Sequence, residues 1–512
     1  MMIWLYVLAS LFLLLMLVGL YDVFQHKRAI TRNFPLLGRF RYFLESIGPE
    51  IRQYIVADNN EERPFNRDQR SWIYASSKKE NNYAGFGTDN DLELTPNYLI
   101  IKHSVFPITA PFPGEPGYDP TYRIPCGKIM GGWRQRPKAF RPNSVVNISG
   151  MSFGSLSSVA VEALNRGAKL CGCLQSTGEG SVTPHHNHGG ELIWQIGTGY
   201  FGCRDEHGKF SIERLKATLQ KYPTVRAIEI KLSQGAKPGA GGILPKEKIT
   251  REIADIRGIP MDRDCCSPAA HSAFRSADQM LDFVEQVAGE TGLPVGIKSA
   301  VGKMEFWHEL VRLMEPGNRG VDFVTIDGGE GGTGAGPIVF ADHVSLPFKQ
   351  GFARVYRAFA DAQVNSRVVF IGSGKLGFPE QAMFAYALGC DMINIAREAM
   401  LSIGCIQAQK CHTNFCPSGV ATQNKWLMRG LDPTLKSARA GNYITTLRKE
   451  ILALCHACGH EHPALVTVND LEIVDDRFGI STLADLFSYH NVKQMPNDEY
   501  LEQLHGLMTH AE

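Results

Sequence analysis

The 512-residue chain is predicted to be an α/β protein built on a (β/α)8 TIM barrel, preceded by an N-terminal transmembrane helix and an irregular N-terminal segment. From about residue 144 onward, short apolar runs alternate with helix-like stretches, which is typical of parallel strands covered on both faces. About eight such units follow one another, the number that closes a barrel. No GxGxxG motif follows the first run, which disfavours an open dinucleotide-binding sheet.

The expected strands are β-branched runs that each end in Gly, Ser or a polar residue. The stronger candidates are Val145–Ser149, Arg226–Leu232, Pro294–Ser299, Val321–Asp327, Arg367–Ser373 and Asp391–Ala396, and the weaker ones are Gly172–Thr177 and Asp264–Ser267. The loops after the carboxyl ends of barrel strands form the active face. The polar and Gly-rich motifs after these runs are therefore expected to meet there.

The N-terminus carries an apolar run, Ile3–Leu20, in which only Ser10 is polar, and this run is just long enough to span a bilayer. A cleaved signal peptide is the main alternative, but it would need a basic start and a small-residue cleavage site. Basic residues instead follow the run, at Lys27, Arg28, Arg32, Arg39 and Arg41. By the positive-inside rule, the expectation is an uncleaved, single-pass anchor in the cell inner membrane with a cytoplasmic catalytic domain.

Charge and composition narrow the possible partners, the domain organisation and the use of the cysteines. The net charge is +1 and no basic stripe is interleaved with aromatic residues, so no nucleic-acid partner is expected. The expected domains are an anchor at 1–25, an irregular region packing on the barrel at 26–143, the barrel with its cysteine loop at 144–430, and a C-terminal helical extension at 431–512. The 12 cysteines form no regular framework, which indicates thiols or metal ligands rather than disulfides.

Cys405, Cys411 and Cys416 lie within twelve residues of one another. Soft thiolate ligands favour zinc, copper(I) or iron–sulfur clusters. Three thiolates rather than four indicate a [3Fe–4S] cluster or a fourth ligand from elsewhere, and simple packing of three buried cysteines is the alternative. Cys455 and Cys458 form a separate C-x2-C that could hold zinc, supply a fourth ligand, or form a buried turn.

Several Gly-rich turns fall on the expected active face. Gly372, Ser373 and Gly374 could direct backbone N–H groups at a phosphate, although they could equally form a tight turn. A cluster of imidazoles after the second run, at His185, His186 and His188, could bind metal, but a polar loop is favoured because no acid or Cys lies at ligand spacing.

Six motifs in order resemble the synthase part of glutamate synthases, a flavin-binding barrel family, from about Ser149 to Asn424. They are SGMSFGSLS, STGEG, GTGYFGC, EIKLSQGAKPGAGGILP, IDGGEGGTGAGP and GCIQAQKCHTNFCPSGVATQ. The resemblance implies FMN and a [3Fe–4S] cluster, with Cys405, Cys411 and Cys416 as the cluster ligands.

The resemblance also implies roles for individual residues. Lys298 is placed near the flavin ring, Gln234 and Lys237 on the 2-oxo acid, and Glu179 where ammonia meets it, so that Glu179, Lys298 and Lys237 are the implied catalytic residues. The implied FMN-binding residues are Met151, Ser152, Ser176, Lys298, Gly328, Gly329, Gly372, Ser373, Gly374 and Lys375.

The implied activity is the reductive amination of a 2-oxo acid by ammonia or an amine, with 2-oxoglutarate to glutamate as the reference reaction. Ala240 and Ile243 replace a carboxylate and an amide of the family pattern, and one histidine, His271, stands where the family has two. No nicotinamide or FAD module is visible, so a ferredoxin or a reductase subunit is the expected electron donor. The alternatives are an enzyme acting on another oxo or amino acid, including N-substituted glutamate synthesis, and a membrane electron-transfer subunit.

Overall fold

The computed structural model describes residues 2–25, 28–492 and 498–509. It divides into two compact units, one reaching to Ser71 and the other from Trp72 to the C-terminus.

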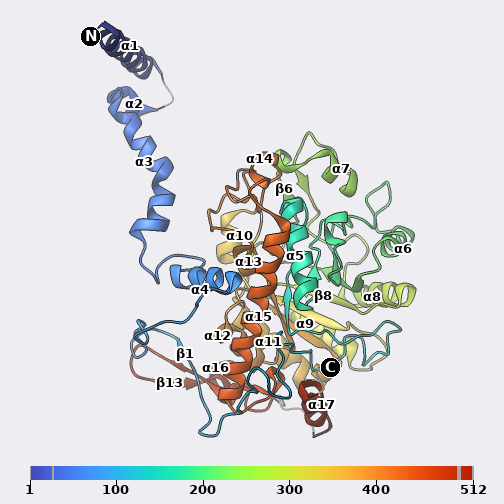
Figure 1. Ribbon diagram of the computed structural model, residues 1–512. Helices are drawn as coiled ribbons and strands as arrows, with labels where there is room; N and C mark the ends of the chain where they lie inside the picture. Colours follow the sequence, from blue (N-terminus) through green and yellow to red (C-terminus); the bar gives the residue numbers. More distant parts are fainter. Residues whose placement is uncertain (1, 26–27, 493–497, 510–512) are drawn as a thin grey trace. The chain divides into compact units, whose positions relative to one another are not determined.

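The second unit is a closed barrel of parallel strands surrounded by helices (Figure 1). In chain order its strands are β2 (Val146–Ile148), β3 (Gln175–Ser176), β4 (Leu192–Ile196), β5 (Val225–Lys231), β8 (Val295–Ser299), β9 (Phe323–Asp327), β10 (Val369–Ser373) and β11 (Met392–Ile395). The barrel closes where β11 pairs with β2, with Ile393 opposite Val146. The predicted fold class is therefore confirmed.

Two of the expected strands need correction. The third barrel strand is β4, which the sequence analysis did not identify, so Arg226–Leu232 corresponds to the fourth strand. The segment Asp264–Ser267 lies outside the barrel, because its β7 (Cys265–Cys266) pairs antiparallel with β6 (Ile243–Leu244). Burial explains the difference: all five residues of β4 are buried, whereas Cys266 is exposed, and a parallel barrel strand must be covered on both faces.

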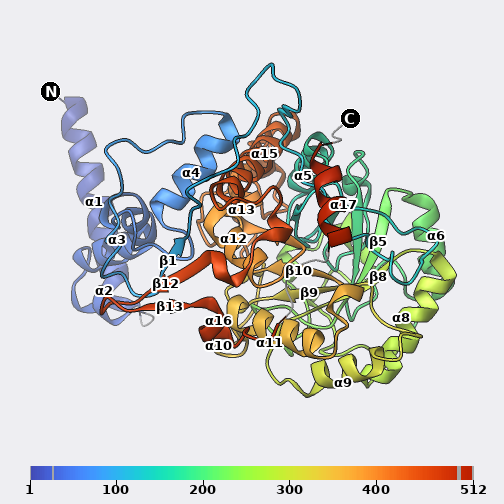
Figure 2. The ribbon, with the colours of Figure 1, turned by 90° about the horizontal axis from the view of Figure 1, so that it is seen from below.

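Helices cover the outside of the barrel, as Figure 2 shows from below. The helices between β2 and the end of α15 are α5 (Ser158–Cys171), α6 (Ile212–Lys221), α7 (Arg251–Arg257), α8 (Ala277–Thr291), α9 (Glu305–Met314), α10 (Ile338–His343), α11 (Phe348–Asp361), α12 (Pro379–Ala387), α13 (Arg397–Ser402), α14 (Lys425–Met428) and α15 (Pro433–Ala457). Serine side chains begin several of them: Ser157 accepts the N–H of Ala160, and Ser276 accepts that of Gln279. Such N-caps satisfy donors that the helix itself leaves unbonded.

The segment before β2 closes the amino-terminal end of the barrel. Cys126, Met130 and Phe140 from this segment are buried in one apolar cluster with strand residues such as Phe323 and Val369. Met130 and Phe140 also form an isolated antiparallel bridge. Apolar side chains thus fill the barrel at this end.

The two ends of the second unit meet in a small antiparallel sheet. Its strands are β1 (Tyr98–Ile101), β12 (Leu471–Val474) and β13 (Ile480–Thr482). The region expected to be irregular therefore supplies one strand, and the region expected to be helical supplies two. Two further helices, α16 (Leu483–Phe487) and α17 (Asp498–Thr509), complete the C-terminal part.

The first unit consists of helices. They are α1 (Met2–Phe24), α2 (Ala29–Asn33), α3 (Leu37–Ile51) and the short π-helix η1 (Arg52–Val56), while α4 (Arg67–Lys78) crosses the boundary to the second unit. Among the described residues, α1 is long and apolar enough to cross a membrane, a property that signal sequences near an N-terminus share.

Candidate active site

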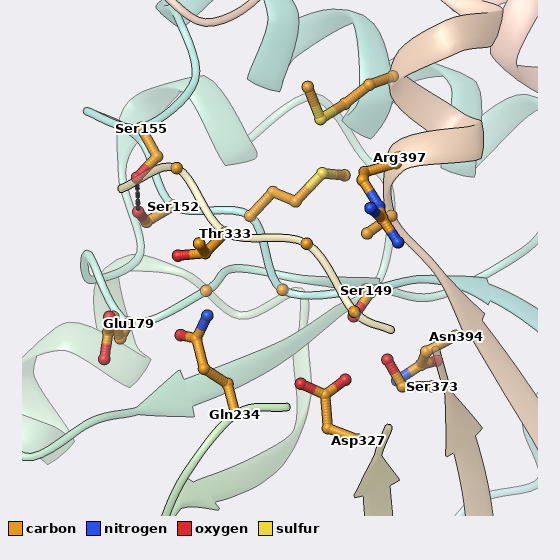
Figure 3. Close-up of a pocket in the computed structure, with 18 of the residues that line it drawn as sticks. Ser149, Ser152, Ser155, Glu179, Gln234, Asp327, Thr333, Ser373, Asn394 and Arg397 are labelled. Carbon is orange, nitrogen blue, oxygen red and sulfur yellow. Dashed lines mark hydrogen bonds between the residues drawn. The ribbon is translucent and has the colours of Figure 1, made fainter. Parts of the chain in front are cut away.

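A large cavity opens at the carboxyl end of the barrel. Its empty volume is about 1120 Å³, including space open to solvent, which is enough for a cofactor together with a small substrate. Predicted site residues that line it are Met151, Ser152, Glu179, Gln234, Lys237, Lys298, Ser373, Gly374, Lys375 and Cys411. Figure 3 shows Glu179 and Gln234 toward one side of the cavity and Ser373, Asn394 and Arg397 toward the other, with Asp327 between them.

Lys298 lines the cavity and pairs with Asp327. Its Nζ is 3.4 Å from Asp327 Oδ1 and donates to Ser149 Oγ at 3.4 Å. The other carboxylate oxygen, Asp327 Oδ2, accepts the backbone N–H of Gly235 at 2.8 Å. Asp327 therefore links the lysine on β8 to the loop that carries Gln234.

Glu179 belongs to a polar chain on the other side of the cavity. Lys231 Nζ is 3.1 Å from Glu179 Oε2 and donates to Gln234 Oε1 at 2.6 Å. Burial alone would raise the pKa of Glu179, but the nearby ammonium of Lys231, with further help from Lys237, holds this pKa below its ordinary value. Glu179 is therefore ionised, and Lys231 orients it together with Gln234.

Lys237 is buried and lines the same side of the cavity. Its Nζ donates to the carbonyl of Ala335 at 2.8 Å, a contact to the Gly-rich loop after β9. Burial lowers the pKa of Lys237 to about 8, although the carboxylate of Glu179 opposes the change. Lys231 and Lys237 carry two positive charges here against the one negative charge of Glu179, so this side of the cavity suits an anionic ligand.

The turn after β10 forms the opposite wall. Gly374 adopts a φ of +139°, and a Cβ there would lie 3.3 Å from the backbone of Gly328. Gly328 itself uses its N–H to bond the carbonyl of Ser373 at 2.8 Å, and Gly329 bonds the carbonyl of Leu346 at 2.9 Å. The N–H groups of Gly328 and Gly329 are thus committed within the protein, and these residues support the turn.

Four predicted cofactor residues are not among the described residues that line the cavity: Ser176, Gly328, Gly329 and Gly372. Gly372 lies in β10, where a Cβ would meet Phe348 at 2.8 Å and Cys390 at 2.9 Å. Close packing of strand and helix accounts for this glycine.

Two buried polar atoms beside the cavity have no hydrogen-bond partner in the described part of the chain. They are Ser176 Oγ and Asn394 Oδ1, and Asn394 also lines the cavity. Ser176 Oγ lies only 3.0 Å from where a Cβ on Gly150 would stand. Buried polar atoms are nearly always bonded, so these two atoms fit a site that receives a polar ligand.

The cysteine loop lies next to the cavity, which Cys411 lines. Cys416 is buried with its Sγ 3.4 Å from Ser418 Oγ, and Cys405 Sγ accepts the N–H of Gln407 at 3.4 Å. No group of three or more His, Cys, Asp or Glu side chains that could hold a metal occurs among residues 2–25, 28–492 and 498–509. The three predicted cluster ligands are therefore not gathered into a metal site in this structure.

The other possible metal groups are likewise engaged in local contacts. Cys455 is buried and lies 3.6 Å from the sulfur of Met383. His185 pairs with Glu252 at 2.7 Å, and His186 bonds Thr183 at 2.9 Å. These contacts fit a buried turn and a polar loop.

Two of the departures noted in the sequence occupy defined places. Ile243 lines the cavity and adds an apolar wall. His271 is buried, with Nδ1 3.0 Å from the hydroxyl of Tyr200 and Nε2 2.9 Å from the carbonyl of Lys231. Burial lowers the pKa of His271 to about 4, so the ring is neutral and supports the backbone of Lys231.

Among the cavity-lining residues that sequence reasoning missed are Gln195, Lys231, Asp327, Asn394 and Arg397. Each lies at or near the carboxyl end of a barrel strand. Three of them lie within predicted strands: Lys231, Asp327 and Asn394. Because side chains alternate between the two faces of a strand, this alternation could have identified them as residues that point toward the site. Gln195 was hidden because β4 was not recognised.

Comparison with known proteins gives a consistent result. The conserved region in glutamate synthase matches residues 133–461. The glutamate synthase large subunit-like protein YerD of Bacillus subtilis is 37% identical over 471 residues, covering 86% of this chain and 89% of that protein. The archaeal glutamate synthase [NADPH] of Methanocaldococcus jannaschii is 35% identical over 321 residues, and the match spans 61% of this chain but only 59% of that protein.

Solved structures resemble the chain more weakly. A flavocytochrome b2 with benzoylformate superposes with a TM-score of 0.45 at 11% identity, covering 93% of this chain and 94% of that one. At this level the superposition adds nothing to the fold or the site described above.

Proposed function

The chain belongs to the glutamate synthase family, whose members are oxidoreductases, and from this premise we propose that it is an FMN-dependent enzyme that reductively aminates a 2-oxo acid. The conversion of 2-oxoglutarate to glutamate is the reference reaction. One observation carries the proposal: a single cavity contains the Lys298–Asp327 pair and, beyond it, the chain of Glu179, Lys231 and Gln234. The first group suits a flavin ring and the second an anionic substrate.

The cavity residues fit FMN. Ser373, Gly374 and Lys375 would hold the phosphate, and the unbonded oxygens of Ser176 and Asn394 would gain polar partners. Lys298 would stand beside the ring, where a cation favours a reduced, anionic flavin. FMN, when bound, supplies the hydride that reduces the imine.

The chain's own residues would prepare the substrate. The ammonium groups of Lys231 and Lys237 attract the carboxylates of the oxo acid, and the amide of Gln234 orients it. Ionised Glu179 can accept a proton from ammonium, which frees ammonia to attack the carbonyl carbon, and within the adduct a second proton moves from the nitrogen to the former carbonyl oxygen to form a hydroxyl. Glu179 then returns that proton to the hydroxyl that leaves as water when the imine forms. These steps place proton transfer and substrate binding on the same side of Asp327.

The finer expectations are also part of the proposal. The spacing of Cys405, Cys411 and Cys416, and the place of Cys411 at the cavity, support a [3Fe–4S] cluster on these residues. In the described structure the three thiols are not arranged as metal ligands. None of the substrate steps above depends on the cluster. A ferredoxin or a reductase subunit is the proposed electron donor. A single-pass inner-membrane anchor with a cytoplasmic barrel is supported by α1 and the basic residues after it.

The test uses the purified full chain in detergent. Visible absorption should show a flavin, and electron paramagnetic resonance should show whether a cluster is present. After anaerobic reduction, ¹⁵N-ammonium plus 2-oxoglutarate should yield labelled glutamate by mass spectrometry. Lys298→Met should abolish turnover, whereas Lys303→Met, an exposed lysine just beyond β8, should not. Folded protein without flavin, or reduced flavin that never transfers electrons to any 2-oxo acid, would overturn the proposal.

A second reaction is favoured by the apolar wall that Ile243 contributes. An apolar side chain here suits an alkyl group on the substrate or on the amine, as in the synthesis of an N-substituted glutamate. Turnover with methylamine and not with ammonium would select this reaction. A purely electron-relaying subunit is disfavoured, because it would have no use for Gln234 and Lys237 in the cavity.

A further inference from the structure

Helix α3 presents an uncovered apolar face within the first unit. Leu37, Phe40, Leu44, Ile47 and Ile51 follow one another at spacings of three and four, which places them on one side of a helix. Leu37 is 77% exposed, Phe40 62% and Leu44 43%, whereas Ile47 and Ile51 are half-buried. A helix of 15 residues extends about 22 Å, so this is a long apolar stripe.

Two more exposed apolar residues extend the stripe, one beside it on α3 and one beyond the end of α3. Phe43 lies beside Phe40 with ring centroids 6.4 Å apart and is 55% exposed. After α3, Ile55 is 77% exposed in η1. Exposed apolar patches of this kind mark interaction sites rather than ordinary surface.

An ion pair between buried Asp22 and partly exposed Arg39 joins α3 to the end of α1. Asp22, near the end of α1, has a fully buried side chain that accepts the N–H of Leu36 at 3.0 Å and pairs with Arg39 at 2.6 Å. Arg39 lies on the polar side of α3, because it falls outside the three- and four-residue spacing of the stripe. The junction thus fixes α1 against the polar side and leaves the apolar side open.

The polar side of this part of the chain is mainly basic. Its exposed basic residues are Arg28, Arg32, Arg39, Arg41 and Arg52, and the acidic residues of α3 are Glu45 and Glu50. The pairs of Arg41 with Glu45 at 2.8 Å and of Arg39 with Asp22 each remove one charge of either sign, and residues 22–52 keep a net charge of +3 from six basic and three acidic residues. Excess positive charge beside an apolar stripe is the composition of helices that lie on anionic membranes.

We propose that α3 lies in the interface of an anionic lipid bilayer, with its apolar stripe among the upper acyl chains and its arginines at the headgroups. The proposal rests on the proposed membrane anchor, because α1 would bring α3 to the headgroup level. It adds a second attachment that orients the first unit, which a single spanning helix cannot do. A second copy of the chain and the chain's own barrel unit are the rival occupants.

Site-specific photo-crosslinking distinguishes these occupants. The full chain is placed as single copies in nanodiscs containing anionic lipid, with Phe40→p-benzoylphenylalanine as the probe. Glu45→p-benzoylphenylalanine on the polar side is the matched control, because it is exposed on the same helix. Illumination followed by mass spectrometry should give phospholipid adducts at position 40 and at least tenfold fewer at position 45.

Each outcome bears on the proposal. Equal lipid adducts at the two positions, or adducts from position 40 to residues 72–512, overturn it. Adducts between two chains in discs loaded with two copies, together with no lipid adduct in single-copy discs, overturn it in favour of a dimer. Extraction of the full chain from membranes by alkaline carbonate would refute the anchor itself. Lipid adducts at position 40 in vesicle-bound protein would then still support the interfacial helix.

Discussion

Lys237 is the cavity cation whose charge should change within an accessible pH range, because burial lowers its pKa to about 8. A bound carboxylate should raise that pKa by about two units, since an opposite charge at close range favours the charged form. Charged Lys237 therefore binds the substrate, and neutral Lys237 does not.

The size of the effect follows from these values. At pH 7 the unliganded ammonium is about nine-tenths charged, and at pH 9 about one-tenth, by the ordinary titration relation around a pKa of about 8. Affinity for the oxo acid should therefore fall about tenfold from pH 7 to pH 9. The sign is set by deprotonation: raising the pH removes the charge that the anion requires.

Calorimetric titration of 2-oxoglutarate into oxidised protein, without a reductant, measures this affinity at pH 7, 8 and 9. Lys237→Gln should bind about a hundredfold more weakly at pH 7, the factor that a pKa rise of about two units implies, with no further loss at pH 9. Lys237→Arg should keep its affinity throughout because arginine stays charged. Wild-type affinity that is flat with pH would refute the reasoning. So would a Lys237→Gln variant that retains the wild-type pH dependence.

Three further predictions concern the same cavity. Asp327→Asn should remove the negative charge beside Lys298 and so raise the flavin reduction potential by tens of millivolts. About 30 mV corresponds to about 1.4 kcal/mol for two electrons. An unchanged potential in a spectroelectrochemical titration would show that the pair does not act on the flavin. Gly374→Ala should destabilise the protein by about 1–3 kcal/mol, because φ of +139° strains a residue with a Cβ, and calorimetry together with loss of flavin absorption would detect it. Glu179→Gln should reduce steady-state turnover by about 10²–10⁴-fold, since the amide cannot move a proton. Single-turnover reduction of a preformed imine should be nearly normal. An equal loss in the steady-state and single-turnover assays would instead indicate that Lys231 is displaced.

The sequence by itself determined the barrel and the face that carries the site. Parallel strands buried on both faces read as continuous apolar runs, and that signal is local to each run. The same reasoning placed Glu179, Gln234, Lys237 and Lys298 after strands, and the structure brings all four to one cavity. Their roles in binding and catalysis remain predictions.

Only the tertiary structure decided which strands close the barrel and how the polar groups pair. β3 has two residues and β4 follows a Gly-rich loop, so neither gives a strong local signal, and β4 is recognised by its pairing with β5. The contacts of Lys231 with Glu179, and of Asp327 with Gly235, join segments far apart in the chain. Such pairings arise from long-range packing, because strand periodicity fixes the direction of a side chain but not the partner that it meets.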